Sequence, residues 1–115
     1  MSANLICMGL DLGTGGARAV VMDFQGQLVA EGRADFPAAA SRVLGPRVEQ
    51  DPLAWTAAAE AAVRGATARL PAGCEIVGIA VDATSGTFLL ADENGRPLTP
   101  GVMYNDLRAA VETPE

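Results

Sequence analysis

The chain has 115 residues, 50% of them apolar and 19% charged, which predicts one folded domain and argues against disorder. Its formal net charge is −6, and its basic residues are all arginine, with no lysine and no histidine. These absences exclude His-dependent nucleophiles, His-ligated zinc, a P-loop lysine and Schiff-base chemistry, and the acidic balance argues against a nucleic-acid partner.

The two cysteines, Cys7 and Cys74, are too few and too far apart for a metal cluster or a disulfide framework. Cys7 lies in an apolar run and is expected to be a small core residue. That run, Leu5–Leu10, is too short for a targeting signal, and no stretch approaches the roughly 18 apolar residues of a membrane span. We therefore expect a cytoplasmic protein that does not bind membranes.

The N-terminal third of the chain predicts a β-hairpin arrangement. Leu5–Leu10 is typical of a short buried strand, and it is followed by the small-residue loop Gly13-Thr14-Gly15-Gly16. Ala17–Phe24 is again rich in valine and alanine and predicts a second strand. A tight turn at Gln25-Gly26 then leads to a partner strand over Gln27–Asp35.

A helix is predicted in the middle of the chain. Phe36–Gln50 contains two prolines and a glycine and is expected to be a connection. Asp51-Pro52 is a favourable helix start, because Asp can cap the helix and Pro suits its first position. Pro71 and Gly73 end the helix. Its apolar side chains recur at helical spacing and are expected to face the core: Trp55, Ala59, Ala62, Val63, Ala66 and Leu70.

The C-terminal part of the chain predicts further short elements. Glu75–Val81 is typical of a buried strand, and Thr87–Ala91 predicts another, which turns at Asn94-Gly95. A short strand over Val102–Tyr104 and a helix that begins near Asp106 complete the expected set.

A weak internal repetition links the two halves of the chain. Twice a strand ends in aspartate and enters a small-residue loop, at Asp11–Gly16 and at Asp82–Gly86. Twice the next strand closes with an Asp-x-x-Gly turn, at Asp23–Gly26 and at Asp92–Gly95. True repetition and a coincidence of common hairpin residues both remain open. In either case two carboxylates lie at strand ends, where ligands gather in α/β sheets.

The loop Asp11–Gly16 carries the most chemical information. Its three glycines permit positive φ and let backbone N–H groups point at an anion, and Thr14 adds a hydroxyl donor. Asp11 is suited to holding a hydrated Mg²⁺ that bridges carboxylate and phosphate oxygens. An ordinary β-turn is the alternative interpretation. A dinucleotide fingerprint is excluded, because its glycine loop must open a helix and this one precedes a predicted strand.

Several ordered segments together resemble the FGGY carbohydrate kinases, of the actin/Hsp70/hexokinase superfamily. The first of them, Gly9–Ala19, looks like the first phosphate motif of that family. The others follow in order: Glu49-Gln50-Asp51-Pro52 with Trp55, then Gly78–Thr87, Asp92–Leu98 and Tyr104–Ala109.

The resemblance implies a fold and an activity. The fold would be α/β and ribonuclease H-like, with a mixed five-stranded sheet and helices. Residues 1–115 would be the N-terminal part of the first domain, on its sugar and phosphate side, with the adenine-binding domain absent. Such kinases transfer the γ-phosphoryl group of Mg·ATP to a sugar hydroxyl. Their general base falls beyond residue 115, so this chain alone is expected to be inactive.

The resemblance also implies roles for particular residues. Asp11 and Thr14 match the catalytic positions, with Asp11 holding Mg²⁺ through water. Phosphate binding falls to Gly13, Thr14, Gly15 and Gly16. Sugar binding falls to Asp82, Thr84, Ser85, Asn105 and Asp106. Plainer alternatives exist: Asp82 can cap the strand end or orient Thr84, Asn105 and Asp106 can start a helix, and Arg108 can simply pair with a carboxylate. For Arg18, structural pairing is expected.

Departures from the family pattern bear on the substrate. Typical xylulokinases carry Gln-Met-His at the positions of Thr84, Ser85 and Gly86, and Tyr104 replaces their usual Trp. The pattern looks closer to kinases proposed to act on D-ribulose, so a ketopentose is expected, D-ribulose before D-xylulose. The expected partners are the sugar and ATP, and a homodimer of the full-length protein is left open. A non-catalytic actin-like nucleotide-binding or interaction module is the alternative function.

Overall fold

The computed structural model describes residues 3–112, which form two compact units. Unit 1 comprises the chain up to Phe36 together with Trp55–Ala83, and unit 2 comprises Pro37–Ala54 and the residues from Thr84 onward. None of the helices in the described residues is long and apolar enough to cross a membrane.

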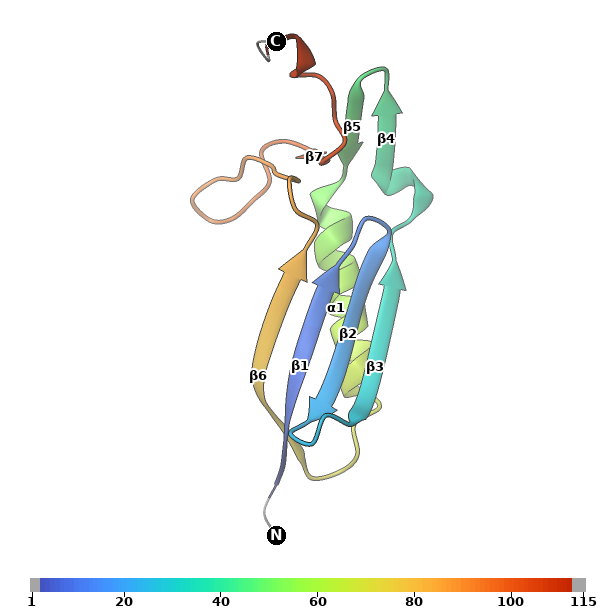
Figure 1. Ribbon diagram of the computed structural model, residues 1–115, viewed down its shortest axis with the longest axis vertical. Coiled ribbons are helices and arrows are strands. Elements are labelled where there is room, and N and C mark those ends of the chain that lie inside the picture. Colours follow the sequence, from blue (N-terminus) through green and yellow to red (C-terminus); the bar gives the residue numbers. More distant parts are fainter. Residues whose placement is uncertain (1–2, 113–115) are drawn as a thin grey trace. The chain divides into compact units, whose positions relative to one another are not determined.

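Unit 1 is built on a four-stranded sheet of mixed direction (Figure 1). Its strands are β1 (Asn4–Leu12), β2 (Gly16–Asp23), β3 (Leu28–Asp35) and β6 (Cys74–Ala83), in the order β3-β2-β1-β6. β1–β2 and β2–β3 are antiparallel, whereas β1 and β6 are parallel. A parallel pair needs a crossover connection, and the helix α1 (Pro52–Thr67) provides it. Of the five strands that the resemblance implies, the described residues supply these four.

The helix α1 begins where the sequence predicts. Asp51 caps it, since its Oδ1 accepts a hydrogen bond from the N–H of Leu53 at 3.0 Å, and Pro52 occupies the first helical position. The α-helix ends at Thr67, three residues before the expected Leu70, and tighter turns carry the chain onward.

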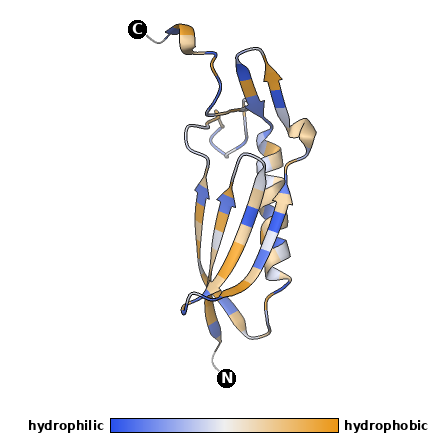
Figure 2. Cartoon of the chain, turned by 45° about the vertical axis from the view of Figure 1, so that its right-hand side comes forward, coloured by the Kyte–Doolittle hydropathy of each residue, from blue (hydrophilic) through white to orange (hydrophobic). Residues whose placement is uncertain are grey.

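The core of unit 1 lies between the sheet and α1, and buried and exposed residues alternate along much of β1 and β2. The strands of this sheet carry both hydrophobic and hydrophilic residues (Figure 2). Ile6 and Met8 point inward, which sends Cys7 between them to the opposite face. The expectation that Cys7 is a core residue is therefore wrong. Successive side chains of a strand point to opposite faces of the sheet, so a residue in an apolar run can still be exposed. The strands and helix bury this set: Ile6, Met8, Ala17, Ala19, Val21, Ala30, Ala58, Ala62 and Ala66.

On the helix, the fully buried residues are alanines rather than the expected large side chain. Ala58, Ala62 and Ala66 are buried at a spacing of four, whereas Trp55 is only half-buried. Of the predicted stripe, Ala62 and Ala66 are buried and Val63 and Leu70 pack against the core, whereas Trp55 and Ala59 lie one position away from the buried row. Small side chains on this face let the helix come close to the sheet.

Gly32 of β3 lies at the point of closest approach between helix and sheet. A Cβ atom built there would collide with the carbonyl oxygen of Ala62 and lie 2.6 Å from the backbone nitrogen of Ala66. Both obstacles are backbone atoms, which no rotamer change can move aside. Only glycine allows this contact without separating α1 from β3.

We expect Gly32→Ala to destabilise the protein by about 3 kcal/mol, because the helix must shift away from the sheet. Gly9→Ala is the matched control, since a Cβ on Gly9 meets nothing within 4 Å in the same sheet. Urea unfolding of both variants measures the difference. Equal midpoints for the two variants would contradict the close approach of α1 to β3.

Unit 2 holds a second, three-stranded sheet, in the order β4-β5-β7. Its strands are β4 (Ser41–Leu44), β5 (Arg47–Gln50) and β7 (Gly101–Val102), and short 3₁₀ helices η1 (Ala38–Ala40) and η2 (Ala110–Glu112) flank them. The β4–β5 hairpin corrects the prediction of an irregular connection over Phe36–Gln50. Every residue of β4 is exposed, so the strand has none of the polar–apolar alternation by which a sequence signals it.

Three further expectations for unit 2 are corrected. Thr87–Ala91 is no regular strand; it makes only isolated bridges, Phe88 to Val102 and Ala91 to Pro97. The short strand expected at Val102–Tyr104 is β7, shifted toward the N-terminus. No α-helix begins near Asp106 within the described residues: the Asp106 Oδ1 accepts a hydrogen bond from the N–H of Arg108 at 3.0 Å, as in a helix cap, yet only the 3₁₀ helix η2 follows.

The two Asp-x-x-Gly turns have the same local geometry. In each, one carboxylate oxygen of the aspartate, Asp23 or Asp92, accepts hydrogen bonds from the backbone N–H groups two and four residues later, at 2.9 and 2.8 Å. The glycines, Gly26 and Gly95, adopt φ of 84° and 76°. Both predicted turns are confirmed.

Candidate functional site

The glycine-rich loop forms the tip of the β1–β2 hairpin. The Gly13 N–H donates to the Gly16 carbonyl oxygen at 2.9 Å and closes the turn. The Gly15 carbonyl accepts from the N–H of Phe36 at 2.8 Å, which ties the tip to the end of β3. The loop leads into a strand and not a helix, so the exclusion of a dinucleotide fingerprint is confirmed.

The expected reason for the glycines is wrong, although their place in the loop is right. Gly13, Gly15 and Gly16 all have negative φ, so none is needed for a left-handed backbone. Gly16 is required because a Cβ there would lie 2.9 Å from the Cα of Asp35 and collide with the Ala34 carbonyl. Gly15 has nothing within 4 Å of its Cβ position, so the backbone is open to a ligand there.

Asp11 and Asp82 stand side by side at the ends of two parallel strands. They are paired in the β1–β6 register, and both are exposed. A hydrogen bond to Asp11, repulsion between the two carboxylates, and desolvation together raise the pKa of Asp82 above its usual value. The sequence predicts both strand ends, and the parallel pairing brings the two carboxylates together.

The carboxylate pair fits a magnesium ion of the kind that the resemblance implies. Mg²⁺ in phosphate-transferring proteins is held by one or two carboxylates, with waters and phosphate oxygens as the other ligands. Asp11 and Asp82 are two such carboxylates, and the raised pKa of Asp82 shows that their negative charges repel each other. A bound cation would relieve this repulsion. Within residues 3–112 no cluster of three or more metal-binding side chains exists, so a fully protein-made metal cage is not found there.

We expect Asp82→Asn to raise the melting temperature by a few degrees at pH 7 in metal-free buffer. The pKa of Asp82 is higher in the folded state than in the unfolded state, where it is about 4. The contribution of Asp82 to the free energy of unfolding is therefore fully present below about pH 4, and it is lost as the pH rises through the raised pKa. The gain should therefore shrink at about pH 4, where the proton is bound. Calorimetry at the two pH values measures it, and a gain independent of pH would contradict the carboxylate repulsion.

In unit 2, two segments expected to bind sugar lie against each other. Gly86 has φ of +71°, and its Cβ position is 3.4 Å from the Cβ of Tyr104. The N–H of Tyr104 donates to the Thr87 hydroxyl at 3.2 Å. Ser85 and Asn105 are both exposed beside this contact, whereas Thr84 is half-buried. The structure thus brings the 84–87 loop and the 104–105 segment together within unit 2.

The side chain of Asp106 is only 3% exposed, whereas its neighbour Asn105 is exposed. Its Oδ2 accepts from the N–H of Val48 at 2.7 Å. Arg108 binds both carboxylate oxygens, with Nε 2.9 Å from Oδ1 and Nη2 2.7 Å from Oδ2, and the same Nη2 lies 2.7 Å from Glu49 Oε1. These bonds hold the pKa of Asp106 well below its usual range.

Glu49 is the residue of this network that the sequence does not reveal. It lies 59 residues from Arg108 in the chain, and no local pattern connects the two. Arg108 pairs with carboxylates, as its alternative interpretation predicts. Together the network fixes the Asn105 segment to the β4–β5 hairpin.

We expect Asp106→Asn to lower the melting temperature by roughly 5–10 °C at pH 7, because Arg108 and the Val48 N–H lose a charged partner. The lowered pKa means that this stability is present above about pH 4 and is lost as pH falls below it. Glu93→Gln removes an exposed carboxylate elsewhere in unit 2 and serves as the control. Thermal scans at pH 7 and at acidic pH test this; identical melting of both variants would contradict it.

Two surface hollows, each of about 400 Å³, lie in different units. One belongs to unit 1 and surrounds the glycine loop; its lining includes Asp11, Arg18, Arg33 and Asp35. Arg18 is held there by an ion pair with Glu31 at 2.9 Å, which confirms its expected structural pairing.

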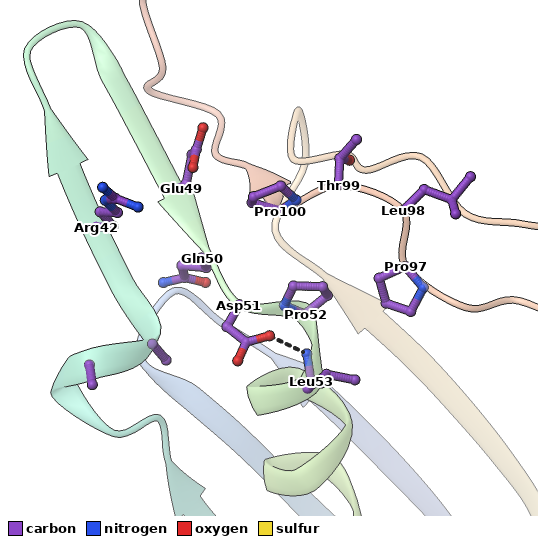
Figure 3. Close-up of a pocket in the computed structure, with 12 residues that line it drawn as sticks. Arg42, Glu49, Gln50, Asp51, Pro52, Leu53, Pro97, Leu98, Thr99 and Pro100 are labelled. Atoms are coloured by element: carbon purple, nitrogen blue, oxygen red, sulfur yellow. Dashed lines mark hydrogen bonds between the residues drawn. The ribbon is translucent and has the colours of Figure 1, made fainter.

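The other hollow belongs to unit 2 and contains none of the expected site residues (Figure 3). It lies between the β4–β5 hairpin, the start of α1 and the proline-flanked segment Pro97–Pro100. Arg42, Glu49 and Asp51 contribute its charged lining, and Asp51 also caps α1. Its other walls are largely alanine, proline and leucine.

Comparison with known proteins places these features in a family. Residues 6–114 match the N-terminal domain of the FGGY family of carbohydrate kinases. The chain belongs to this family.

Individual relatives agree with that assignment. Xylulose kinase from Klebsiella pneumoniae is 32% identical over 105 residues, which cover 91% of this chain and 21% of that protein. Xylulose kinase from Lactococcus lactis is 26% identical over 112 residues, covering 94% and 21%. The crystal structure of a xyloylose kinase from Brucella ovis superposes with a TM-score of 0.83 at 30% identity, covering 93% of this chain and 22% of that one. The chain thus spans about a fifth of the length of the relatives it matches, and the first-domain fold expected from the sequence is confirmed.

Proposed function

We propose that the full-length protein is a kinase that transfers the γ-phosphoryl group of ATP to a hydroxyl of a sugar. The observation that carries this proposal is the glycine-loop hairpin with Asp11 and Asp82 paired beside it at the ends of parallel strands. Phosphoryl transfer depends on positioning and electrostatic stabilisation, and a hairpin tip next to a carboxylate pair is suited to both.

The glycine loop and the two aspartates of unit 1 each have a role in this proposal. Asp11 would hold a hydrated Mg²⁺ beside the phosphates, and Asp82, paired with it in the strand register, would bind the sugar. The Thr14 hydroxyl and the open backbone at Gly15 receive phosphate oxygens. When bound, Mg²⁺ neutralises charge that develops on the phosphate oxygens.

Unit 2 supplies the other sugar contacts in this proposal. Ser85 and Asn105 are exposed and contact the sugar, and Thr84 lines the same loop. The buried carboxylate of Asp106 acts mainly through its neighbours: by binding Val48 and Arg108 it holds Asn105 in place. Asp106 is therefore a positioning residue in the sugar site.

A ketopentose is the proposed substrate, with D-ribulose preferred. Gly86 has no side chain at the place where typical xylulokinases carry His, and Tyr104 packs beside it in place of Trp. D-xylulose is the second candidate, because the relatives described above are xylulose kinases.

The direct test couples ADP release by the full-length protein, with Mg·ATP, to a panel of ketopentoses and polyols. We expect turnover with D-ribulose and little with D-xylulose. Turnover with D-xylulose alone would overturn the assignment of Gly86 and Tyr104 while keeping the kinase. Silence across the panel would favour a non-catalytic actin-like nucleotide-binding module.

The same assay tests Asp11. Asp11→Ala should lower kcat about 100-fold or more, with little change in the KM for sugar, because the lost interaction acts on the phosphates. Glu75→Ala is the matched control, a carboxylate at the other end of the same parallel pair. A collapse of sugar affinity with unchanged kcat would contradict the role of Asp11.

A further inference from the structure

A row of four charged residues crosses the sheet of unit 1 near the glycine loop. The strand register pairs Asp82 with Asp11, Asp11 with Arg18, and Arg18 with Arg33. Residues paired directly on neighbouring strands point to the same face of a sheet. The strands lie in the order β6-β1-β2-β3 (Figure 1). The register therefore places two negative and then two positive residues on one face.

Of the two arginines in this row, only one has its charge balanced by an ion pair in the described residues. Arg18 forms its ion pair with Glu31 at 2.9 Å. Arg33 is exposed and forms no ion pair within the part of the chain that the structure describes. Like charges directly opposite each other on adjacent strands are destabilising. The end of the row therefore carries a positive charge that an anion would neutralise.

Arg33 also lines the hollow that surrounds the glycine loop, together with Thr14 and Gly15. Its volume of about 400 Å³ is within the range of small-molecule sites. Asp11 and Asp35 line the same hollow and would repel an anion, while Arg18, which also lines it, is paired with Glu31. An anion in this hollow thus depends on Arg33 to offset the charge of these carboxylates.

We propose that Arg33 is a phosphate-binding residue, which adds a guanidinium on the β3 side of the glycine loop to bind the polyphosphate of the nucleotide. This proposal rests on the proposed kinase function. The planar guanidinium binds two phosphate oxygens at once, a geometry that the loop amides and the Thr14 hydroxyl do not provide. The cost of opposing Arg33 to Arg18 is offset when phosphate is bound.

The test compares Arg33→Gln with Arg64→Gln in the full-length protein. Arg64 is an exposed arginine of α1 without an ion pair in the described residues, so its variant removes the same charge elsewhere in unit 1. Calorimetric titration should show that Arg33→Gln raises the Kd for Mg·ATP about tenfold. Its melting temperature in phosphate-free buffer should rise, because the repulsion with Arg18 is gone. Arg64→Gln should change neither, and Arg33→Lys should recover part of the affinity.

Opposite changes in affinity and stability distinguish phosphate binding from a structural role. Unchanged Mg·ATP affinity in Arg33→Gln would overturn the proposal, as would a parallel loss of affinity and melting temperature. If the parent protein itself fails to bind Mg·ATP, the kinase function has failed, and inorganic pyrophosphate then tests Arg33 separately. Pyrophosphate should raise the melting temperature of the parent but not of Arg33→Gln; an equal rise in both would overturn the proposal.

Discussion

The contact between α1 and β3 is the constraint on which unit 1 depends. Because Gly32 lets the helix backbone rest directly on the strand, the buried face of α1 consists of alanines and not of large side chains. The helix also leads into β6, and it forms part of the long crossover that lets β6 pair in parallel with β1. Parallel pairing in turn places Asp11 beside Asp82. The close helix contact, the crossover and the carboxylate pair are thus consecutive consequences of one packing arrangement.

The candidate residues of the two units differ in how their charges are arranged. Asp82 beside Asp11, and Arg33 opposite Arg18, place like charges together on one face of the sheet. In unit 2 the Asp106–Arg108–Glu49 network does the reverse and satisfies buried charge with short bonds. Strained electrostatics where ligands are proposed to bind, supported by satisfied networks elsewhere, is a common arrangement in enzymes.

Local signals in the sequence were sufficient for the hairpin at the glycine loop, the capped start of α1, both Asp-x-x-Gly turns and the family of the chain. They were insufficient wherever the deciding contact is remote. The β4 strand has no alternation because it is wholly exposed, and Glu49 meets Arg108 only through the fold. Cys7 lies in an apolar run, yet strand alternation turns it outward. For Gly16, the sequence located the residue but not the reason, which is the approach of β3.

The hydrogen bonds between the β4–β5 hairpin and the segment that follows β7 have a mechanical consequence. Pro46 accepts from Leu107, Val48 exchanges bonds with Met103 and Asp106, and Glu49 binds Arg108. Four hydrogen bonds within a few residues hold the two segments together, so that they are expected to move as one body. A force applied at the exposed hairpin tip is therefore transmitted to Asn105, so the orientation of a proposed sugar-binding side chain is set by a surface loop far from it in the chain.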